Sequence, residues 1–208
     1  ATSLCFLAVP TIMAQQEWDD HYRSHKTLAK DLAKDYLESC PKNAILFSFG
    51  DNDTYPLWYA QEVEGIRRDV RVVNLSLIAV DWYINKLRNK VNDSPGLKLA
   101  LSEEQYRGKN NNQVFFASPR GEDMTAPMNV FEALRRIGDP NNTIQGQSYI
   151  PTRNFYLPID KKKYSELPFA GKIDSSEWVD FIPFRFPTSS NYILKDELAI
   201  MDVIVSNF

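Results

Sequence analysis

The first half of the chain alternates between short apolar runs and stretches in which apolar residues have helical spacing. Residues 44–49 form a short, mostly apolar run, which is typical of a strand that is covered on both faces. A helical pattern follows over residues 54–65, and then come a second apolar run at 70–75 and a helix that begins at Asp81. This order predicts a βαβ unit, in which a right-handed crossover joins two parallel strands.

An amphipathic helix is predicted ahead of this unit, over residues 24–40, and Pro41 ends it. Its apolar stripe comprises Leu28, Leu32, Tyr36 and Leu37. Charged residues occupy most of the remaining positions, as expected of a helix that turns one face toward a core.

The pattern is weaker in the second half of the chain. The elements predicted there are a polar loop or lid (92–112), a strand (113–117), a helix (125–137), a turn-rich segment (138–147), two aromatic edge strands or extended arms (154–159 and 177–186) and a final helix (195–206). The prolines at 158 and 183 favour sheet edges for the aromatic stretches. The predicted fold class is α/β, with a Rossmann-like βαβ core, a mainly parallel sheet flanked by helices, and an irregular β-rich C-terminal half.

The composition is that of an ordinary globular domain. The chain has 208 residues, 43% of them hydrophobic, which is enough to bury a core without help from a metal or a disulfide. Its net charge of -3 disfavours nucleic acid as a partner, because such binders usually carry a basic face. Cys5 and Cys40 allow either one bridge or two buried free thiols, and they form neither a disulfide framework nor a zinc motif.

The N-terminal segment is uncharged as far as Gln16, and residues 4–14 are almost wholly apolar. A membrane span needs about 20 apolar residues, and a signal peptide needs a basic start, so neither fits the segment as it stands. Three alternatives are left open by the pattern: a buried first strand, an interfacial segment, or the last turns of a transmembrane helix.

The turn after the first predicted strand, residues 50–54, is the first candidate site. Asp51 and Asp53 could hold Mg²⁺, Mn²⁺ or Ca²⁺ with a diphosphate, as an Asp-x-Asp motif does in nucleotide-sugar transferases. Open α/β sheets bind ligands at this edge, so Asn52 and Thr54 are candidate ligand-binding residues as well. The alternative is a plain turn whose side chains make local hydrogen bonds and cap the next helix.

Three further candidates belong to the same edge of the predicted sheet. Asp81 follows the second strand and could lie close to the acidic turn. Trp58 and Trp82 could stack on a sugar ring there, and ordinary core packing is the alternative for both.

The two histidines of the chain form a second metal hypothesis. On a helix His21 and His25 would share one face, and with Asp19 or Asp20 they would make a plausible ligand set for a divalent metal. The alternative is a solvated helix start, in which the carboxylates meet the positive end of the helix dipole.

Arginines offer a weaker hypothesis, because any exposed arginine could hold an anionic group. The residues concerned are Arg67, Arg68, Arg71, Arg120 and Arg153. The sequence contains no Gly-x-Ser-x-Gly elbow, P-loop or Gly-x-Gly-x-x-Gly loop, so no catalytic residue is assigned.

Several long blocks resemble a family of multi-pass membrane proteins of Bacteroidetes. The blocks are QEWDDHYRS, NAILFSFGDNDTYPLWYAQEVEGIRRDVRVVNLSL, DWYINKL, RNFYLPIDKKK and LKDELAIMDVIVSNF. That family was long described as a domain of unknown function and is now described as glycosyltransferase-like and related to protein O-mannosyltransferases. The resemblance is strong over residues 16–87 and 153–208 and loose between 92 and 147.

The resemblance implies a location and a division of labour. Residues 1–15 would be juxtamembrane or the end of a transmembrane span, and residues 16–208 a single α/β domain on the periplasmic face of the inner membrane. Sugar transfer from a polyprenyl-phosphate donor would be carried out by the membrane half of the same polypeptide.

Three functions are therefore open at this point. The first is an accessory domain of a membrane glycosyltransferase-like protein that binds acceptor protein or glycan. The second is a self-contained, metal-dependent nucleotide-sugar or phosphosugar enzyme that uses the 51–53 loop. The third is a purely structural interaction module without a small ligand.

Overall fold

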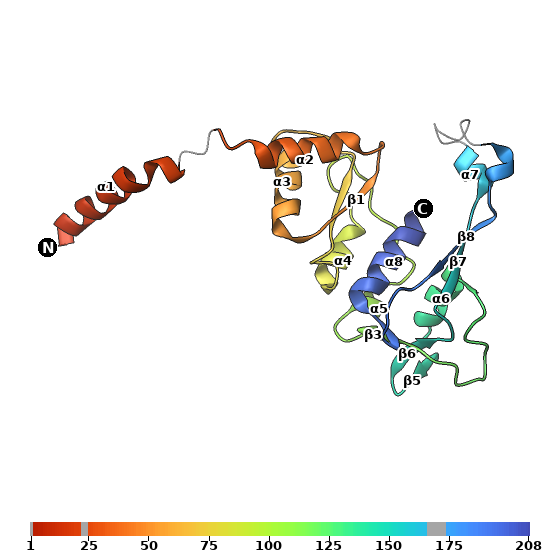
Figure 1. Cartoon of the computed structure of the whole chain (residues 1–208). Coiled ribbons are helices and arrows are strands. Elements are labelled where there is room, and N and C mark those ends of the chain that lie inside the picture. The colour runs from red at the N-terminus through yellow and green to blue at the C-terminus, as the bar shows by residue number, and fades with distance from the viewer. Residues whose placement is uncertain (1, 22–24, 166–173) are drawn as a thin grey trace. The chain divides into compact units, whose positions relative to one another are not determined.

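The computed structural model describes residues 2–21, 25–165 and 174–208 (Figure 1). The chain divides into two compact units, which are unit 1 (Ala1–Val72) and unit 2 (Val73–Phe208). Each unit is described by itself. The prediction of one domain over residues 16–208 stays a prediction.

Unit 1 begins with α1 (Thr2–His21), for which the sequence left three alternatives open. The elements that follow are those that the apolar pattern predicted, with small shifts at their ends: α2 (Leu28–Ser39), β1 (Ile45–Ser48), α3 (Gly50–Glu62) and the start of β2 (Arg71–Asn74). β1 and β2 are hydrogen-bonded in a two-stranded sheet. The helix predicted to begin at Thr54 begins at Gly50 instead, so that the acidic turn is the first turn of α3.

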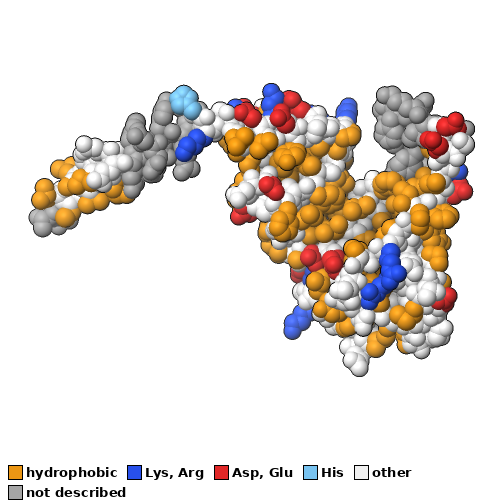
Figure 2. Space-filling model, viewed as in Figure 1, with side chains coloured by type: hydrophobic (Ala, Val, Ile, Leu, Met, Phe, Trp, Pro, Cys, Tyr) orange, Lys and Arg blue, Asp and Glu red, His pale blue; other side chains and the backbone are white. Residues whose placement is uncertain are grey.

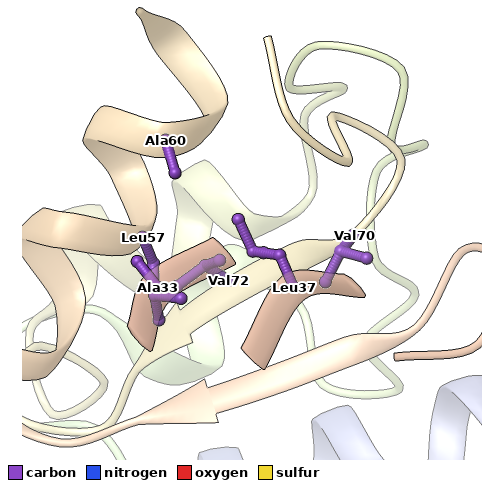
Figure 3. Close-up of a cluster of buried hydrophobic side chains, with 6 residues drawn as sticks. All are labelled: Ala33, Leu37, Leu57, Ala60, Val70 and Val72. Carbon is purple, nitrogen blue, oxygen red and sulfur yellow. The ribbon is translucent and has the colours of Figure 1, made fainter. Parts of the chain in front are cut away.

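A small apolar cluster forms the core of unit 1 (Figure 3). Its members come from α2, α3, the residue before β2 and β2 itself: Ala33, Leu37, Leu57, Ala60, Val70 and Val72. The side chains of Ala33 and Ala60 are small, which permits a close approach of α2 and α3.

The predicted apolar stripe of α2 needs a correction. Leu37 is buried, but Leu28, Leu32 and Tyr36 are 73%, 48% and 59% exposed. The helix packs through the ridge of Ala33 and Leu37, where the side chains are short enough for α3, and this leaves the longer side chains in solvent.

The N-terminal segment is a helix, so the buried-strand alternative is wrong. Leu4, Phe6 and Leu7 of α1 are largely exposed, and hydrophobic side chains cover much of the visible face of this helix (Figure 2). Within residues 2–21, 25–165 and 174–208, no helix has both the length and the apolar character needed to cross a membrane. The juxtamembrane placement of residues 1–15 stays a prediction.

Unit 2 contains two small sheets in which parallel and antiparallel pairs alternate. The first has the order β5-β6-β3-β9 and the second β4-β7-β8. Their strands are β3 (Gln113–Phe116), β4 (Met128–Asn129), β5 (Thr143–Ile144), β6 (Gln147–Ile150), β7 (Asn154–Pro158), β8 (Phe181–Arg185) and β9 (Tyr192–Leu194). β3 is parallel to β6 and antiparallel to β9, while β7 is parallel to β4 and antiparallel to β8.

The helices of unit 2 are mostly short. They are α4 (Asp81–Leu87), α5 (Glu103–Tyr106), α6 (Val130–Ile137), α7 (Lys161–Ser165), a 3-10 turn (Ser175–Glu177) and α8 (Lys195–Asn207). α6 begins at Val130 and not at Thr125, because Asn129 caps it by accepting a hydrogen bond from the Phe131 N–H at 2.9 Å. α6 packs on β6 and β7, and its buried side chains include Leu134 and Ile137.

The mixed α/β class is confirmed. The single, mainly parallel sheet with a Rossmann-like core is not what the described residues contain, since their strands form three small sheets of mixed pairing. Short strands explain the difference. Most have two to four residues, and such strands pair with whichever neighbour the loops bring to their edge.

Candidate functional site

The acidic turn of unit 1 is closed by its own hydrogen bonds. The hydroxyls of Ser48 and Thr54 lie 2.8 Å apart, and the Thr54 hydroxyl donates to the Gly50 carbonyl at 2.6 Å. Gly50 has φ +74°, a conformation that side-chain-bearing residues rarely adopt, which explains a glycine between β1 and α3. Thr54 thus has a structural role in the turn.

Asp51, Asn52 and Asp53 are exposed in the first turn of α3. Two carboxylates at this end of a helix are stabilised by its dipole. Within the described ranges no group of three or more His, Cys, Asp or Glu side chains is placed to hold a metal ion. A cation here would need ligands beyond these residues, and the metal site stays a prediction.

The predicted tryptophans differ in exposure. Trp58 of α3 is half-buried against the unit 1 core and lies 5.7 Å from Tyr55, measured between ring centroids. Trp82 of α4 in unit 2 is 58% exposed and makes an edge contact with Tyr83. Core packing explains the buried part of the Trp58 side chain. It does not explain Trp82, whose side chain is mostly exposed.

The predicted histidine pair falls on the border of the described residues. His21 ends α1, and residues 22–24 lie outside the described part of the chain. His25 lies in a turn before α2 and is exposed. The hypothesis of one helical face shared by both histidines therefore lies outside what the structure describes.

Asp81 is tied to Lys195 within unit 2. Lys195 Nζ lies 3.0 Å from Asp81 Oδ1 and also donates to the carbonyls of Tyr106 and Gly108, at 2.8 and 2.6 Å. Asp81 Oδ2 accepts from the Gly108 N–H. Desolvation raises the pKa of the Asp81 carboxyl, but the bonds from Gly108 and Lys195 outweigh it and the net pKa is lowered. Asp81 joins α4, the 106–108 turn and α8.

A second carboxylate, that of Asp202 in α8, is fully buried. Asp202 accepts hydrogen bonds from the Ala100 and Leu101 N–H groups, at 2.7 and 3.1 Å, and from the hydroxyl of Tyr106 at 2.9 Å. Burial, followed by the charge of Asp202, raises the pKa of Tyr106 far above its usual value, so this hydroxyl stays protonated and donates. Asp202 fixes the position of residues 100 and 101.

Residues 100 and 101 form part of the wall of a cavity of about 740 Å³ in unit 2. We call it the arginine cavity. The side chains that matter for its chemistry are Gln105, Arg120, Phe131, Arg135, Arg136 and Asn142. α6 contributes three of them, and the 100–105 segment and the loops around 120 and 142 contribute the others.

Two amides hold the walls of the cavity. The Gln105 side chain donates to the Gly138 carbonyl at 2.6 Å and accepts from the Ser102 N–H at 2.6 Å. The Asn142 amide donates to the carbonyls of Arg136 and Tyr149. Both N–H groups of the Asn142 amide and one of the two N–H groups of the Gln105 amide are therefore committed to the protein itself.

The three arginines of the cavity differ in charge balance. Arg136 pairs with Glu122 at 2.6 Å and with Glu132 at 2.9 Å, and these bonds raise its pKa against the effect of burial. Arg120 and Arg135 are exposed and make no ion pair or side-chain hydrogen bond with any residue that the structure describes. Two guanidinium groups of the cavity therefore have no ion-pair partner among the described residues.

The other arginines singled out in the sequence are engaged elsewhere. Arg67 binds Asp69 and three carbonyl oxygens in unit 1, and Arg153 binds the carbonyls of residues 188 and 190 while it stacks on Phe116. Arg71 is buried, and Arg68 also has a partner. Of the five, only Arg120 lines this cavity.

Sequence reasoning missed Phe131 and Arg135 as site residues. Phe131 is 41% exposed and lines the cavity. A signal was available, because Phe131 and Arg135 are four residues apart and therefore share one side of the helix. The spacing alone did not say which side faced a cavity.

A second cavity, of about 500 Å³, lies beside Lys195. Lys109, Gln113, Gln147 and Asp196 line it as well. Because the Lys195 amine is already bound to Asp81 and two carbonyls, this cavity lacks the two open cations that distinguish the arginine cavity.

These observations define a mixed α/β protein with a polar, arginine-lined cavity. The profile of the TMEM260-associated domain 2 family matches residues 29–208, and the chain belongs to this family. Neither the curated proteins nor the solved structures gave a match. The family links the chain to a glycosylation-related membrane protein. The sequence resemblance had implied the same general link to a glycosyltransferase-like membrane protein.

Proposed function

We propose that this chain is a glycan-binding accessory domain of a glycosylation-related membrane protein, and that the arginine cavity is its binding site. The observation that carries the proposal is a cavity of about 740 Å³ in a member of this family. Small-molecule sites commonly have volumes of about 300–1,000 Å³. An aromatic ring at the wall suits the apolar face of a sugar, and the guanidinium groups suit its oxygen atoms.

The location and the partner of the domain are proposed from the sequence resemblance and the family match. We propose a position on the periplasmic face of the inner membrane and a partner in the membrane half of the same polypeptide, which would carry out the sugar transfer. The alternative is that the domain binds the acceptor protein instead of a glycan. The structural-module reading is supported for the acidic turn, whose side chains close the turn itself.

Titration of the ¹⁵N-labelled chain with neutral and acidic mono- and disaccharides tests the proposal. We expect saturable chemical-shift changes at the amides of Phe131, Arg135 and Asn142, which surround the cavity. Unlabelled acceptor-like peptides serve as the comparison. Absence of any shift at the cavity with every saccharide would overturn the glycan-binding proposal.

A further inference from the structure

The arginine cavity has an unbalanced set of hydrogen-bonding groups. Arg136 is neutralised by Glu122 and Glu132, whereas Arg120 and Arg135 have no acidic partner in the described residues. Since each guanidinium carries five N–H donors, the open donors of the cavity are concentrated on these two side chains.

The carboxylates at the cavity are hydrogen-bonded to groups other than these two arginines. Glu132 is bound to Arg136, and Asp139 Oδ1 accepts from the backbone N–H and the side-chain amide of Asn141, at 2.9 and 3.2 Å. Each of these acidic groups is thus held by a neighbour other than Arg120 or Arg135. An anionic ligand would meet cations that no internal carboxylate occupies.

The side-chain amides of the cavity offer few open donors, since of their four N–H groups three donate to backbone carbonyls. Gln105 and Asn142 already donate to backbone carbonyls, and their rearrangement would release the walls at Gly138 and Tyr149. A neutral sugar would therefore find few donors apart from the guanidinium groups. A ligand with a carboxylate or phosphate can accept two parallel hydrogen bonds from one guanidinium fork.

We propose that the arginine cavity selects acidic sugars, binding their carboxylate or phosphate oxygens through Arg120 and Arg135 while the ring packs on Phe131. This inference rests on the proposed glycan-binding function and names its ligand class. Charge, and not the shape of one particular sugar, is the basis of the selection.

Calorimetry with three ligands that share one ring separates charge from ring recognition. Glucuronic acid carries a carboxylate, glucose 6-phosphate carries a phosphate, and glucose carries neither. We expect at least one of the two acidic ligands to bind about tenfold or more tightly than glucose. Its affinity should fall as sodium chloride is raised, because salt screens the charges. The tighter of the two shows which oxyanion the cavity prefers.

Variants assign the effect to the cavity. Arg120→Gln and Arg135→Gln should each weaken the acidic ligand by about tenfold or more, and Arg135→Lys should also weaken it because the fork is lost. Arg107→Gln is the matched control, since Arg107 is an exposed arginine of unit 2 that does not line the cavity. Circular dichroism should show unchanged melting for all four variants.

Phe131→Ala tests the sugar ring separately. It should weaken glucuronic acid and glucose 6-phosphate and leave inorganic phosphate and acetate, measured as ring-free anions, unaffected.

The possible failures differ. If glucose binds at the cavity as tightly as both acidic ligands, or if Arg120→Gln and Arg135→Gln leave the affinities unchanged, the acidic-sugar inference is wrong and the glycan-binding function stands. If inorganic phosphate or acetate binds as tightly as the acidic sugars, the ring contributes nothing and the inference is overturned. If none of the saccharides binds, both proposals fall.

Discussion

Unit 1 and unit 2 are held together in different ways. In unit 1 an apolar cluster joins α2, α3 and the start of β2, and its side-chain hydrogen bonds cover shorter separations, such as 6 residues from Ser48 to Thr54 and 30 from Arg67 to the Leu37 carbonyl. In unit 2 buried charged side chains join segments that are far apart in sequence, and Asp202 binds the Ala100 N–H across 102 residues. The two cavity arginines without an ion-pair partner among the described residues also belong to unit 2.

This difference separates the residues that stabilise the fold from those that are open to a ligand. A buried charge is tolerated only when its hydrogen bonds are complete, so Asp202 and Lys195 are committed to the fold. The exposed Arg120 and Arg135 have no such commitment in the described residues, and they remain available to a ligand. Stability should therefore respond to the first pair of residues, and binding to the second.

The largest effect is expected at the buried carboxylate of unit 2. Asp202→Ala should lower the free energy of unfolding of unit 2 by about 3–5 kcal/mol, because two buried donors and the part-buried Ala100 N–H lose their acceptor at about 1–3 kcal/mol each. Urea denaturation followed by residue-resolved hydrogen exchange measures the change. Asp196→Ala, in the first turn of the same helix, is the control and should cost about 1 kcal/mol or less. Equal losses in the two variants would contradict the contrast between the units.

The next effect concerns the apolar core of unit 1. Leu37→Ala should destabilise unit 1 by about 2–4 kcal/mol, since the side chain is fully buried and its removal leaves a cavity. Leu32→Ala, on the same helix but 48% exposed, should cost about 1 kcal/mol or less. Hydrogen exchange of α2 and α3 amides reports both. A larger loss of stability for Leu32→Ala than for Leu37→Ala would contradict this, because it would mean that another surface covers the exposed side chains of α2.

A pH-dependent effect is expected at Asp69 in unit 1. The hydrogen bond from Arg67, followed by that from the Asn43 N–H, lowers the pKa of Asp69 well below its ordinary value of 3.8. Because the pKa of Asp69 is lower in the folded than in the unfolded chain, its carboxylate stabilises unit 1 fully at pH values above 3.8. This stabilisation is lost as the pH falls from 3.8 toward the lowered pKa of the folded state. Asp69→Asn should therefore cost about 1–2 kcal/mol at pH 7 and progressively less below about pH 4.

Urea unfolding of both proteins between pH 2 and 7 measures this difference. Asp35→Asn, at an exposed position of α2, is the control and should leave the stability at pH 7 nearly unchanged. A difference between wild type and Asp69→Asn that stays constant down to pH 2 would contradict the role of the Arg67–Asp69 pair.

The smallest effect is expected at the acidic turn. The double variant Asp51→Asn, Asp53→Asn should cost about 1 kcal/mol or less, because it removes only favourable charge at the start of α3. Thr54→Val should cost more, about 1–2 kcal/mol, since one buried and one part-buried hydrogen bond are lost. Calorimetry with Mn²⁺ should give no binding that depends on the two aspartates. Tight Mn²⁺ binding lost in the double variant would instead establish the predicted metal site.

The sequence by itself determined the elements of unit 1 and several of unit 2. Apolar spacing located α2, β1, α3, β2 and α4 to within a few residues, and it located β3, β7, β8 and α8 as well. Periodicity succeeds here because it reports the local backbone geometry, which nearby residues control. The α/β class follows from the same local information.

Only the tertiary structure decided which partners and which surfaces these elements have. The sequence did not show that Lys195 meets Asp81 across 114 residues, or that α2 packs through Ala33 and leaves Leu32 exposed. It likewise did not separate Arg120, which lines a cavity, from Arg67, which is paired with Asp69. The physical reason is that pairing and burial depend on distances between segments remote in sequence, and a local pattern of apolar and polar residues does not contain those distances.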